Sequence, residues 1–301
     1  MHHWLLFKKY TSIKLLVYIH FMNFLSVYTK DEKILWIKKG KVPLYQGTDG
    51  KKILYISSVA LQISAADNSK VMPIVSGIAA HLSTTCGEIF NVKIVPPALI
   101  HIELTDPTLA AWLDNLTGGV ASLEKMGDWG LGRGEEFLNS CLLPPASWER
   151  ENKNQLLFDI QYTHARCCSL IQLADREGLI KLKKSISDDE SFIPAQPIPW
   201  LDCEQKLRFH QPDEVRLIHQ LVKMVDDLVF PDSSSSVYWE TAAVKLSKAF
   251  DSFWCNCRIW GEVKTNSPEL AQARLGLLIA TQLVLRSVLE TKLGVFAPLE
   301  L

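Results

Sequence analysis

The sequence has no cysteine or histidine pattern that is typical of a metal site or a disulfide scaffold. Its seven cysteines are an odd number without regular spacing, no two of them form a CxxC pair, and none of the eight histidines belongs to an HExxH segment. A chain of 301 residues buries enough surface to fold without disulfide bonds. We therefore expect free thiols in a reducing compartment, and no bound metal or other cofactor.

A long apolar run is also missing near the N-terminus. The segment IKLLVYIHFMNFLSVY at 13–28 is apolar, but His20 and Asn23 interrupt it. It is shorter than the roughly 20 residues that a membrane-spanning helix needs, and no small-residue cleavage site follows it. Although Lys8 and Lys9 precede the segment as in a signal peptide, an amphipathic N-terminal helix explains it better. We expect a cytoplasmic protein without a membrane contact.

Arginine is absent from the first 116 residues, which hold 12 lysines and 8 acidic residues and so carry a net charge of +4. The rest of the chain is acidic, with a net charge of −5, and the whole chain carries −1. A nearly neutral chain is not typical of a protein that attracts nucleic acid through its overall field. Any phosphate binding would have to use local patches.

The first third of the chain predicts a small α+β domain with an antiparallel sheet. Two short extended stretches flank a glycine-containing turn in VPLYQGTDGKKILYI, and NVKIVPPALIHIEL predicts two more strands joined at the paired prolines. In the last strand Ile100, Ile102 and Leu104 alternate with His101 and Glu103, which gives one apolar face. Helices are expected over SSVALQISAA, MPIVSGIAAHL and DPTLAAWLDNL.

Residues 117–154 contain the glycine-rich run GDWGLGRG at 127–134. This run lacks the GxxxxGK[ST] form of a phosphate loop, and no clear strand leads into it as a dinucleotide fingerprint requires. We interpret 117–154 as an interdomain linker, so the two expected domains are 1–116 and 155–301.

Residues 155–301 predict an all-α bundle of four helices. Apolar residues repeat at helical spacing in the segment from Phe158, in 212–230, in 241–262 and in the segment that runs from Ser267 to Gly294. The polar residues 181–203 and the serine run at 233–236 are expected to be surface loops.

The segment FDIQYTHARCCSLIQLA at 158–174 places a histidine, an arginine and two cysteines within five positions. His164 and Cys167 would share a helix face while Cys168 diverges, so the group is a poor zinc site. A thiolate nucleophile needs a positioned base and an orienting group, whereas a cysteine in an apolar helix stripe is usually inert. We interpret Cys167 as a core residue.

Three segments of the second half resemble the DALR-type anticodon-binding domain of arginyl-tRNA synthetases. QYTHARCCSLI is similar to the family pattern QYAHARICSI, and FDSFWCNCRIWGE and LAQARLGLLIATQLVLRSVLETKLGVFAPLEL follow in the family's order. VPLYQGTDGKKILYISSVALQIS and KIVPPALIHIELTDPTLAAWL resemble the N-terminal additional domain of the same enzymes, although Pro97 and Ala98 replace residues of its GPGF motif. The resemblance implies an α+β domain followed by an all-α DALR-type bundle.

The catalytic part of such a synthetase has no counterpart in this sequence. Only 41 residues separate Leu116 from Phe158, where these enzymes carry a Rossmann-type catalytic domain, and no HIGH-like or KMSKS-like segment occurs. The resemblance therefore implies a non-catalytic tRNA-binding protein, with arginine tRNA as the candidate ligand. Two alternatives stay open: a protein-interaction scaffold that has lost RNA binding, and an accessory subunit that supports aminoacylation by a synthetase in trans.

The resemblance also implies which residues would hold an anticodon loop. They lie in the first motif, in the predicted third helix and at the C-terminus: Tyr162, His164, Arg166, Trp254, Asn256, Arg258 and Leu301. Asp106 matches the turn that contacts the tRNA elbow in the family. Roles without RNA are the alternative for five of them: packing for Tyr162 and Trp254, an exposed charge or an ion pair for Arg258, and pinning of their helix for His164 and Arg166.

Overall fold

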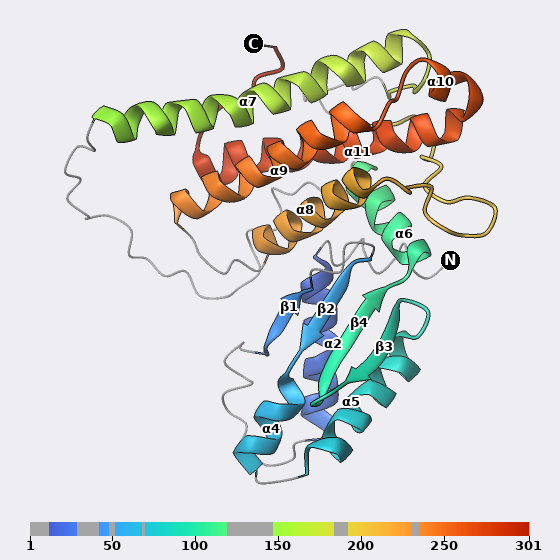
Figure 1. The fold of residues 1–301 in the computed structure, drawn as a ribbon, viewed down its shortest axis with the longest axis vertical. Helices are drawn as coiled ribbons and strands as arrows, with labels where there is room; N and C mark the ends of the chain where they lie inside the picture. Colours follow the sequence, from blue (N-terminus) through green and yellow to red (C-terminus); the bar gives the residue numbers. More distant parts are fainter. Residues whose placement is uncertain are drawn as a thin grey trace. The chain divides into compact units, whose positions relative to one another are not determined.

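The structure, a computed structural model, describes residues 12–28, 42–47, 52–67, 70–118, 147–183, 192–229 and 235–300. Contacts divide the chain into two compact units (Figure 1). The N-terminal unit holds the described residues up to 115 together with 199–229, and the C-terminal unit holds the others. None of the helices in the described ranges is long and apolar enough to cross a membrane.

The N-terminal unit is built on an antiparallel sheet of four strands in the order β1-β2-β4-β3. The strands are β1 (Leu44–Gln46), β2 (Leu54–Ser57), β3 (Phe90–Val95) and β4 (Leu99–Leu104). Along β4, Ile100, Ile102 and Leu104 are buried while His101 and Glu103 are partly exposed, which confirms the predicted alternation. Burial of this apolar face fixes the register, because a slip by one residue would turn it to solvent.

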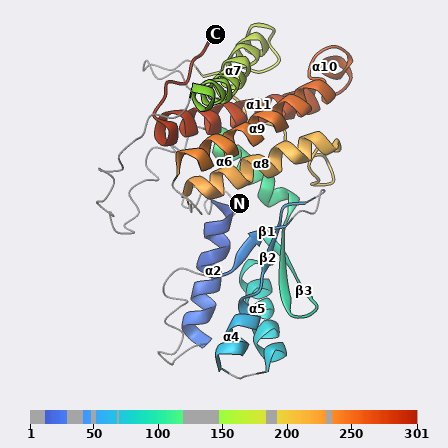
Figure 2. The same ribbon diagram turned by 60° about the vertical axis from the view of Figure 1, so that its left-hand side comes forward.

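Helices cover the buried face of the sheet (Figure 2). They are α2 (Ile13–Tyr28), α4 (Val59–Asp67) and α5 (Val71–Cys86). A further helix, α6 (Asp106–Thr117), follows β4. α5 packs on β3 and β4, and both α2 and α4 pack on α5. Ile74, Ile78 and Leu82 of α5 are buried at the spacing that predicts this helix from the sequence.

One further helix, α8 (Pro212–Val229), belongs to the N-terminal unit and packs on α2. A buried carboxylate joins it to two other segments. The Asp226 side chain accepts hydrogen bonds from Ser12 Oγ at 2.8 Å, from the Lys14 amide at 2.9 Å and from the Tyr55 hydroxyl of β2. The prediction that 212–230 is a helix is confirmed, but its expected grouping with a four-helix bundle of 155–301 differs from this packing.

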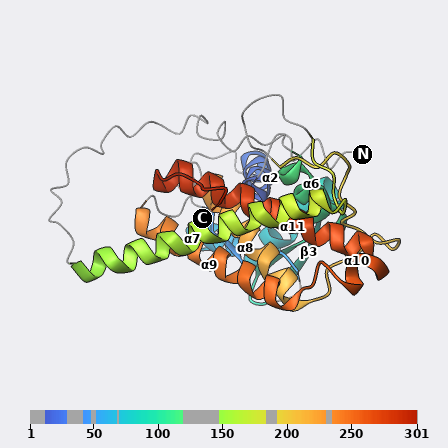
Figure 3. The same cartoon turned by 90° about the horizontal axis from the view of Figure 1, so that it is seen from above.

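The C-terminal unit is a bundle of three long helices, α7 (Ser147–Arg176), α9 (Ser236–Asn256) and α11 (Pro268–Val288). Each of the three packs on the other two, and Figure 3 shows them lying side by side. The short helix α10 (Glu262–Asn266) and the π-helical turn η3 (Leu289–Leu293) precede and follow α11. Gly294 ends η3 in the left-handed conformation at φ 65°, as its position as a helix stop predicts.

Three boundaries differ from the sequence-based expectation, one of them the start of α9 at Ser236 instead of 241. α7 begins at Ser147, inside the predicted linker 117–154, of which 119–146 lie outside the described residues. α9 ends at Asn256 instead of continuing to 262: the Cys257 amide donates to the Phe253 carbonyl, and Cys257 itself is extended. Gly261 then adopts φ 73°, which favours glycine, before α10 begins. Arg258 therefore lies in the turn after the helix.

Candidate nucleic-acid interface

Two exposed aromatic rings and a cation lie along one face of α7. Phe158, Tyr162 and Arg166 are spaced four residues apart, so their side chains lie above one another on the helix surface. Phe158 and Tyr162 are each 49% exposed, and their rings are stacked with centroids 6.2 Å apart and an interplanar angle of 21°. The packing alternative for Tyr162 is thus not what the structure shows.

Arg166 connects this face to α9. Its Nη1 lies 3.5 Å from Asp251 Oδ1, and its guanidinium carbon lies 5.2 Å from the centre of the Trp254 ring. Arginine favours this position over an aromatic face because the ring carries negative charge density there. The guanidinium is only partly exposed, so the ion pair and the ring together fix its place.

The aromatic surface continues beyond α9 to Trp260. The Trp254 and Trp260 rings meet edge to face with centroids 5.9 Å apart, and neither is fully buried. Trp260 Nε1 donates to Glu177 Oε2 at 2.9 Å, and Lys264 Nζ donates to the same oxygen at 2.8 Å. The Lys264 hydrogen bond is the main cause of a lowered pKa at Glu177, which keeps this carboxylate charged. We call Phe158, Tyr162, Arg166, Trp254 and Trp260 the aromatic strip.

Asn256 and Arg258 are exposed at the end of α9 and in the turn after it. The Arg258 carbonyl accepts a hydrogen bond from Arg274 Nη1, which ties this turn to α11. Within the described parts of the chain the Arg258 side chain makes no ion pair, so its charge is available to a ligand. The ion-pair alternative for Arg258 therefore finds no partner among those residues.

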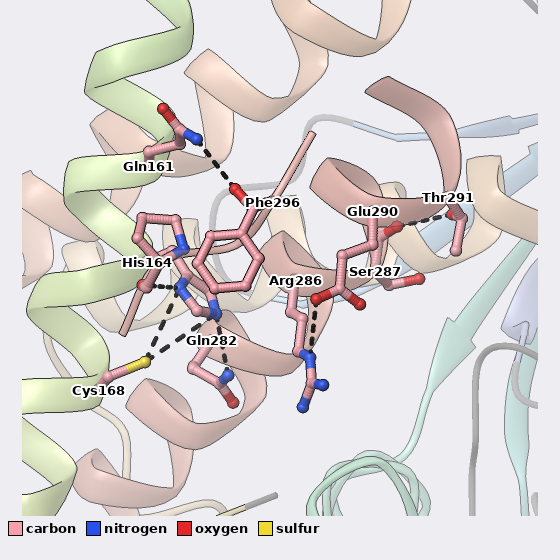
Figure 4. A network of polar contacts seen from close by, with 10 residues as sticks. Gln161, His164, Cys168, Gln282, Arg286, Ser287, Glu290, Thr291 and Phe296 are labelled. Atoms are coloured by element: carbon pink, nitrogen blue, oxygen red, sulfur yellow. Dashed lines mark hydrogen bonds and ion pairs between the residues drawn. The ribbon is translucent and has the colours of Figure 1, made fainter. Parts of the chain in front are cut away.

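His164 is buried and all its polar contacts are within the protein (Figure 4). Its Nδ1 lies 2.8 Å from the Pro298 carbonyl oxygen, and the Gln282 side-chain amide nitrogen lies 3.0 Å from its Nε2. Since a carbonyl can only accept, Nδ1 carries the proton and Nε2 accepts from Gln282. Burial lowers the pKa of His164 and keeps the ring neutral. The geometry thus favours the structural alternative for His164 over a direct RNA contact.

The neighbouring cysteines do not supply a reactive thiol. Cys167 is fully buried, which confirms it as a core residue, and burial raises the pKa of its thiol well above the usual range. Cys168 is also buried, with its Sγ 3.8 Å from His164 Nδ1. Within the described ranges no group of three or more histidine, cysteine or acidic side chains is placed to hold a metal ion.

The remaining predicted residues lie elsewhere. Leu301 is outside the described residues. Asp106 begins α6 in the N-terminal unit, where its carboxylate accepts a hydrogen bond from the Leu207 amide at 3.3 Å. An elbow contact by Asp106 stays a prediction.

Sequence reasoning did not single out Trp260 or its partners Glu177 and Lys264. Trp260 lies six residues after Trp254, a spacing that would place it on another face if the helix continued. The turn at 257–261 brings the two rings together instead. The glycine at 261 was the available signal, because it can start a turn that a helix cannot contain.

Residues 160–301 match the family of the DALR anticodon binding domain. The C-terminal half of this chain carries a DALR anticodon binding domain. All parts of the aromatic strip except Phe158 fall within the matched residues. No solved structure matches the chain.

Several arginine–tRNA ligases are similar to the chain over this DALR half. The ligase of Synechococcus sp. (strain JA-3-3Ab) is 29% identical over 168 residues, which are 54% of this chain and 26% of the ligase. The ligase of Salinibacter ruber is 32% identical over 151 residues, 50% of this chain and 23% of the ligase. The ligase of Moorella thermoacetica is 33% identical over 144 residues, which are 47% of this chain and 22% of the ligase. The chain thus spans about a quarter of the length of these relatives, and their catalytic domain is not part of the match.

Proposed function

We propose that the chain binds tRNA through the aromatic strip of its DALR domain and has no aminoacylation activity of its own. The observation that carries the proposal is that Tyr162 is exposed and Trp254 partly exposed on the surface of this domain, with the Arg166 guanidinium over the Trp254 ring. Unpaired bases stack on aromatic rings and on guanidinium planes, which is how single-stranded RNA is usually read. An anticodon loop offers such bases.

Arginine tRNA is the ligand that we propose, because the relatives of the DALR half are arginine–tRNA ligases. The proposal of a non-catalytic role rests on the short interval between Leu116 and Phe158 and on the absence of HIGH-like and KMSKS-like segments. A second role is compatible with the same surface: an accessory subunit that presents tRNA to a separate ligase. Addition of the chain to such a ligase should then raise the rate of arginylation at limiting tRNA.

Binding of the full chain to labelled arginine tRNA, measured by fluorescence anisotropy at several salt concentrations, tests the proposal. Stacking contributes about 1–3 kcal/mol per base, so Trp254→Ala and Tyr162→Ala should each weaken binding roughly tenfold. Val237→Ala is a suitable control: this residue is 67% exposed and starts the same helix, about 25 Å from Trp254 along its axis. Unchanged affinity in both aromatic variants would contradict the assigned surface.

The charge of Arg258 gives a second test of the same surface. If it contacts a phosphate, Arg258→Ala should reduce the slope of log affinity against log salt by about 1. The absence of any tRNA binding at low salt would overturn the binding proposal, because phosphate contacts are strongest there. Formation of arginyl-tRNA by the chain alone, with ATP and arginine, would overturn the non-catalytic part.

A further inference from the structure

The last described segment of the chain, 295–300, has no regular secondary structure and lies against α7. It leaves the left-handed turn at Gly294, where the Val295 amide donates to the Leu289 carbonyl. Two α7 side chains, Gln161 and His164, then hold alternate carbonyls of the segment. Gln161 Nε2 donates to the Phe296 oxygen at 2.9 Å, and His164 Nδ1 donates to the Pro298 oxygen at 2.8 Å.

This clamp is rigid on the protein side. His164 is fully buried and its other ring nitrogen accepts from Gln282 of α11, so its ring cannot turn without breaking a second buried hydrogen bond. Ala297 and Pro298 are buried beneath the clamp. Figure 4 shows both α7 side chains reaching the segment from one side.

Phe296 is the exception within this fixed segment, because its side chain is 73% exposed, the largest fraction among the exposed large apolar residues described. Its backbone is anchored on Gln161, which is adjacent to Tyr162 and three residues from Phe158. Phe158, three residues before Gln161, shares the face of α7 that holds the segment, and its ring stacks on the half-exposed ring of Tyr162. Because the backbone is already held, only the two side-chain torsions of Phe296 lose freedom when a flat group packs on its ring.

We propose that Phe296 is a further base-contacting residue that extends the aromatic strip, and that Gln161 and His164 are positioning residues that hold it there. The inference rests on the proposed tRNA binding. A phenyl ring offers stacking and no hydrogen bonds, so it accepts any unpaired base. The residue therefore adds affinity for the RNA loop and little selectivity among bases.

The test compares the affinity of the full chain for labelled arginine tRNA across matched variants. Phe296→Ala should weaken binding about fivefold and Phe296→Trp should retain it, since stacking contributes about 1 kcal/mol or more. Gln161→Ala, which leaves the buried core intact, should weaken binding about threefold by loosening the Phe296 backbone. Gln272→Ala is the control, because it also removes an amide bond to a backbone carbonyl, that of Leu179 at 3.2 Å, away from the segment.

The double variant Gln161→Ala/Phe296→Ala distinguishes positioning from a general structural effect. If Gln161 acts through Phe296, its replacement should cause no further loss once the ring is gone. An equal loss in both backgrounds would overturn the positioning role. Unchanged affinity in Phe296→Ala, with Trp254→Ala still weakened, would overturn this inference and leave the proposed function intact. Failure of the unaltered chain to bind tRNA would instead remove the proposed function itself.

Discussion

In the N-terminal unit a buried carboxylate joins three segments that are far apart in the sequence, and in the C-terminal unit a buried imidazole does the same. Asp226 of α8 accepts from residues at the start of α2 and from Tyr55 of β2. His164 of α7 donates to the chain near Pro298 and accepts from Gln282 of α11. Both groups are buried and hydrogen-bonded, as buried polar groups in proteins generally are.

Asp226 and His164 differ in how their protonation changes the stability of the fold as pH falls. Burial raises the pKa of Asp226 to about 6, although its hydrogen bonds act in the opposite direction. Burial lowers the pKa of His164, and its bond to the Pro298 carbonyl offsets this only in part. A raised carboxyl pKa stabilises the fold as pH falls through it, whereas a lowered histidine pKa destabilises the fold as pH falls. The comparison shows that similar buried junctions can respond to pH with opposite sign.

The largest expected effect comes from removing a donor to Asp226. Tyr55→Phe leaves the buried carboxylate with one hydrogen bond fewer, and we expect a loss of about 2 kcal/mol in the free energy of unfolding at pH 7. Hydrogen exchange of peptides from β2 and α8 in the intact chain measures this loss of stability. Tyr45→Phe, in β1 and 64% exposed, is the matched control and should change stability by less than about 0.5 kcal/mol. Equal effects in the two variants would show that the junction is unimportant.

The next effect concerns the charge of Asp226 itself. Between pH 7 and pH 5 the native chain should gain about 1 kcal/mol at this junction, because the folded carboxyl binds a proton at about pH 6 and the unfolded one only near pH 4. Asp226→Asn cannot titrate and should lose this gain. Exchange rates of α8 peptides, corrected for the intrinsic pH dependence of exchange, measure the difference. The same pH dependence in both proteins would contradict the raised pKa.

His164→Asn should shift the pH response of the C-terminal unit in the other direction. An asparagine can still donate to the Pro298 carbonyl and accept from Gln282, but it has no proton to gain. The native unit should therefore lose stability relative to the variant as pH falls below about 6.5, where an unfolded histidine becomes charged. Exchange of α7 and α11 peptides at pH 7 and pH 5 measures this. A pH response unchanged by the substitution would place the acid sensitivity elsewhere.

The smallest expected effect concerns Asp106 of the N-terminal unit, whose contact with the tRNA elbow is a prediction. Asp106→Asn keeps an acceptor for the Leu207 amide while it removes a negative charge. We expect less than about a twofold change in tRNA affinity, against roughly tenfold for Trp254→Ala. A clear gain in affinity would support the elbow contact, because a carboxylate repels nearby phosphates. Anisotropy measurements at low salt provide the sensitivity.

Much of the fold follows from local patterns in the sequence. The alternation in β4, the helical spacing of Ile74, Ile78 and Leu82, and the glycine at 294 each predict the element that the structure contains. Such signals are reliable because they depend on residues that are two to four positions apart. The motifs around Tyr162 and Trp254 also led to the domain family that the comparisons show.

The candidate site was predicted less completely. Arg166 lies over the Trp254 ring, and Trp260 meets that ring because α9 ends at Asn256. An RNA contact by these residues stays a prediction. His164 had two equally good interpretations in the sequence, and its burial distinguishes them. A histidine on a helix carries no local sign of which side chains surround it.

The sequence by itself determined the order of strands and helices along the chain, the apolar face of each element and the similarity of the second half to the DALR anticodon binding domain. The tertiary structure decided which helix or strand packs against each apolar face. The amphipathic pattern of α8 does not say which surface it packs on. Its packing on α2 and the hydrogen bonds of Asp226 to Ser12, the Lys14 amide and Tyr55 group it with the N-terminal unit. Periodicity depends only on neighbouring residues. The packing partner of an apolar face, or the hydrogen-bond partner of a buried charge, lies far away in the sequence and is determined by shape fit and hydrogen bonding.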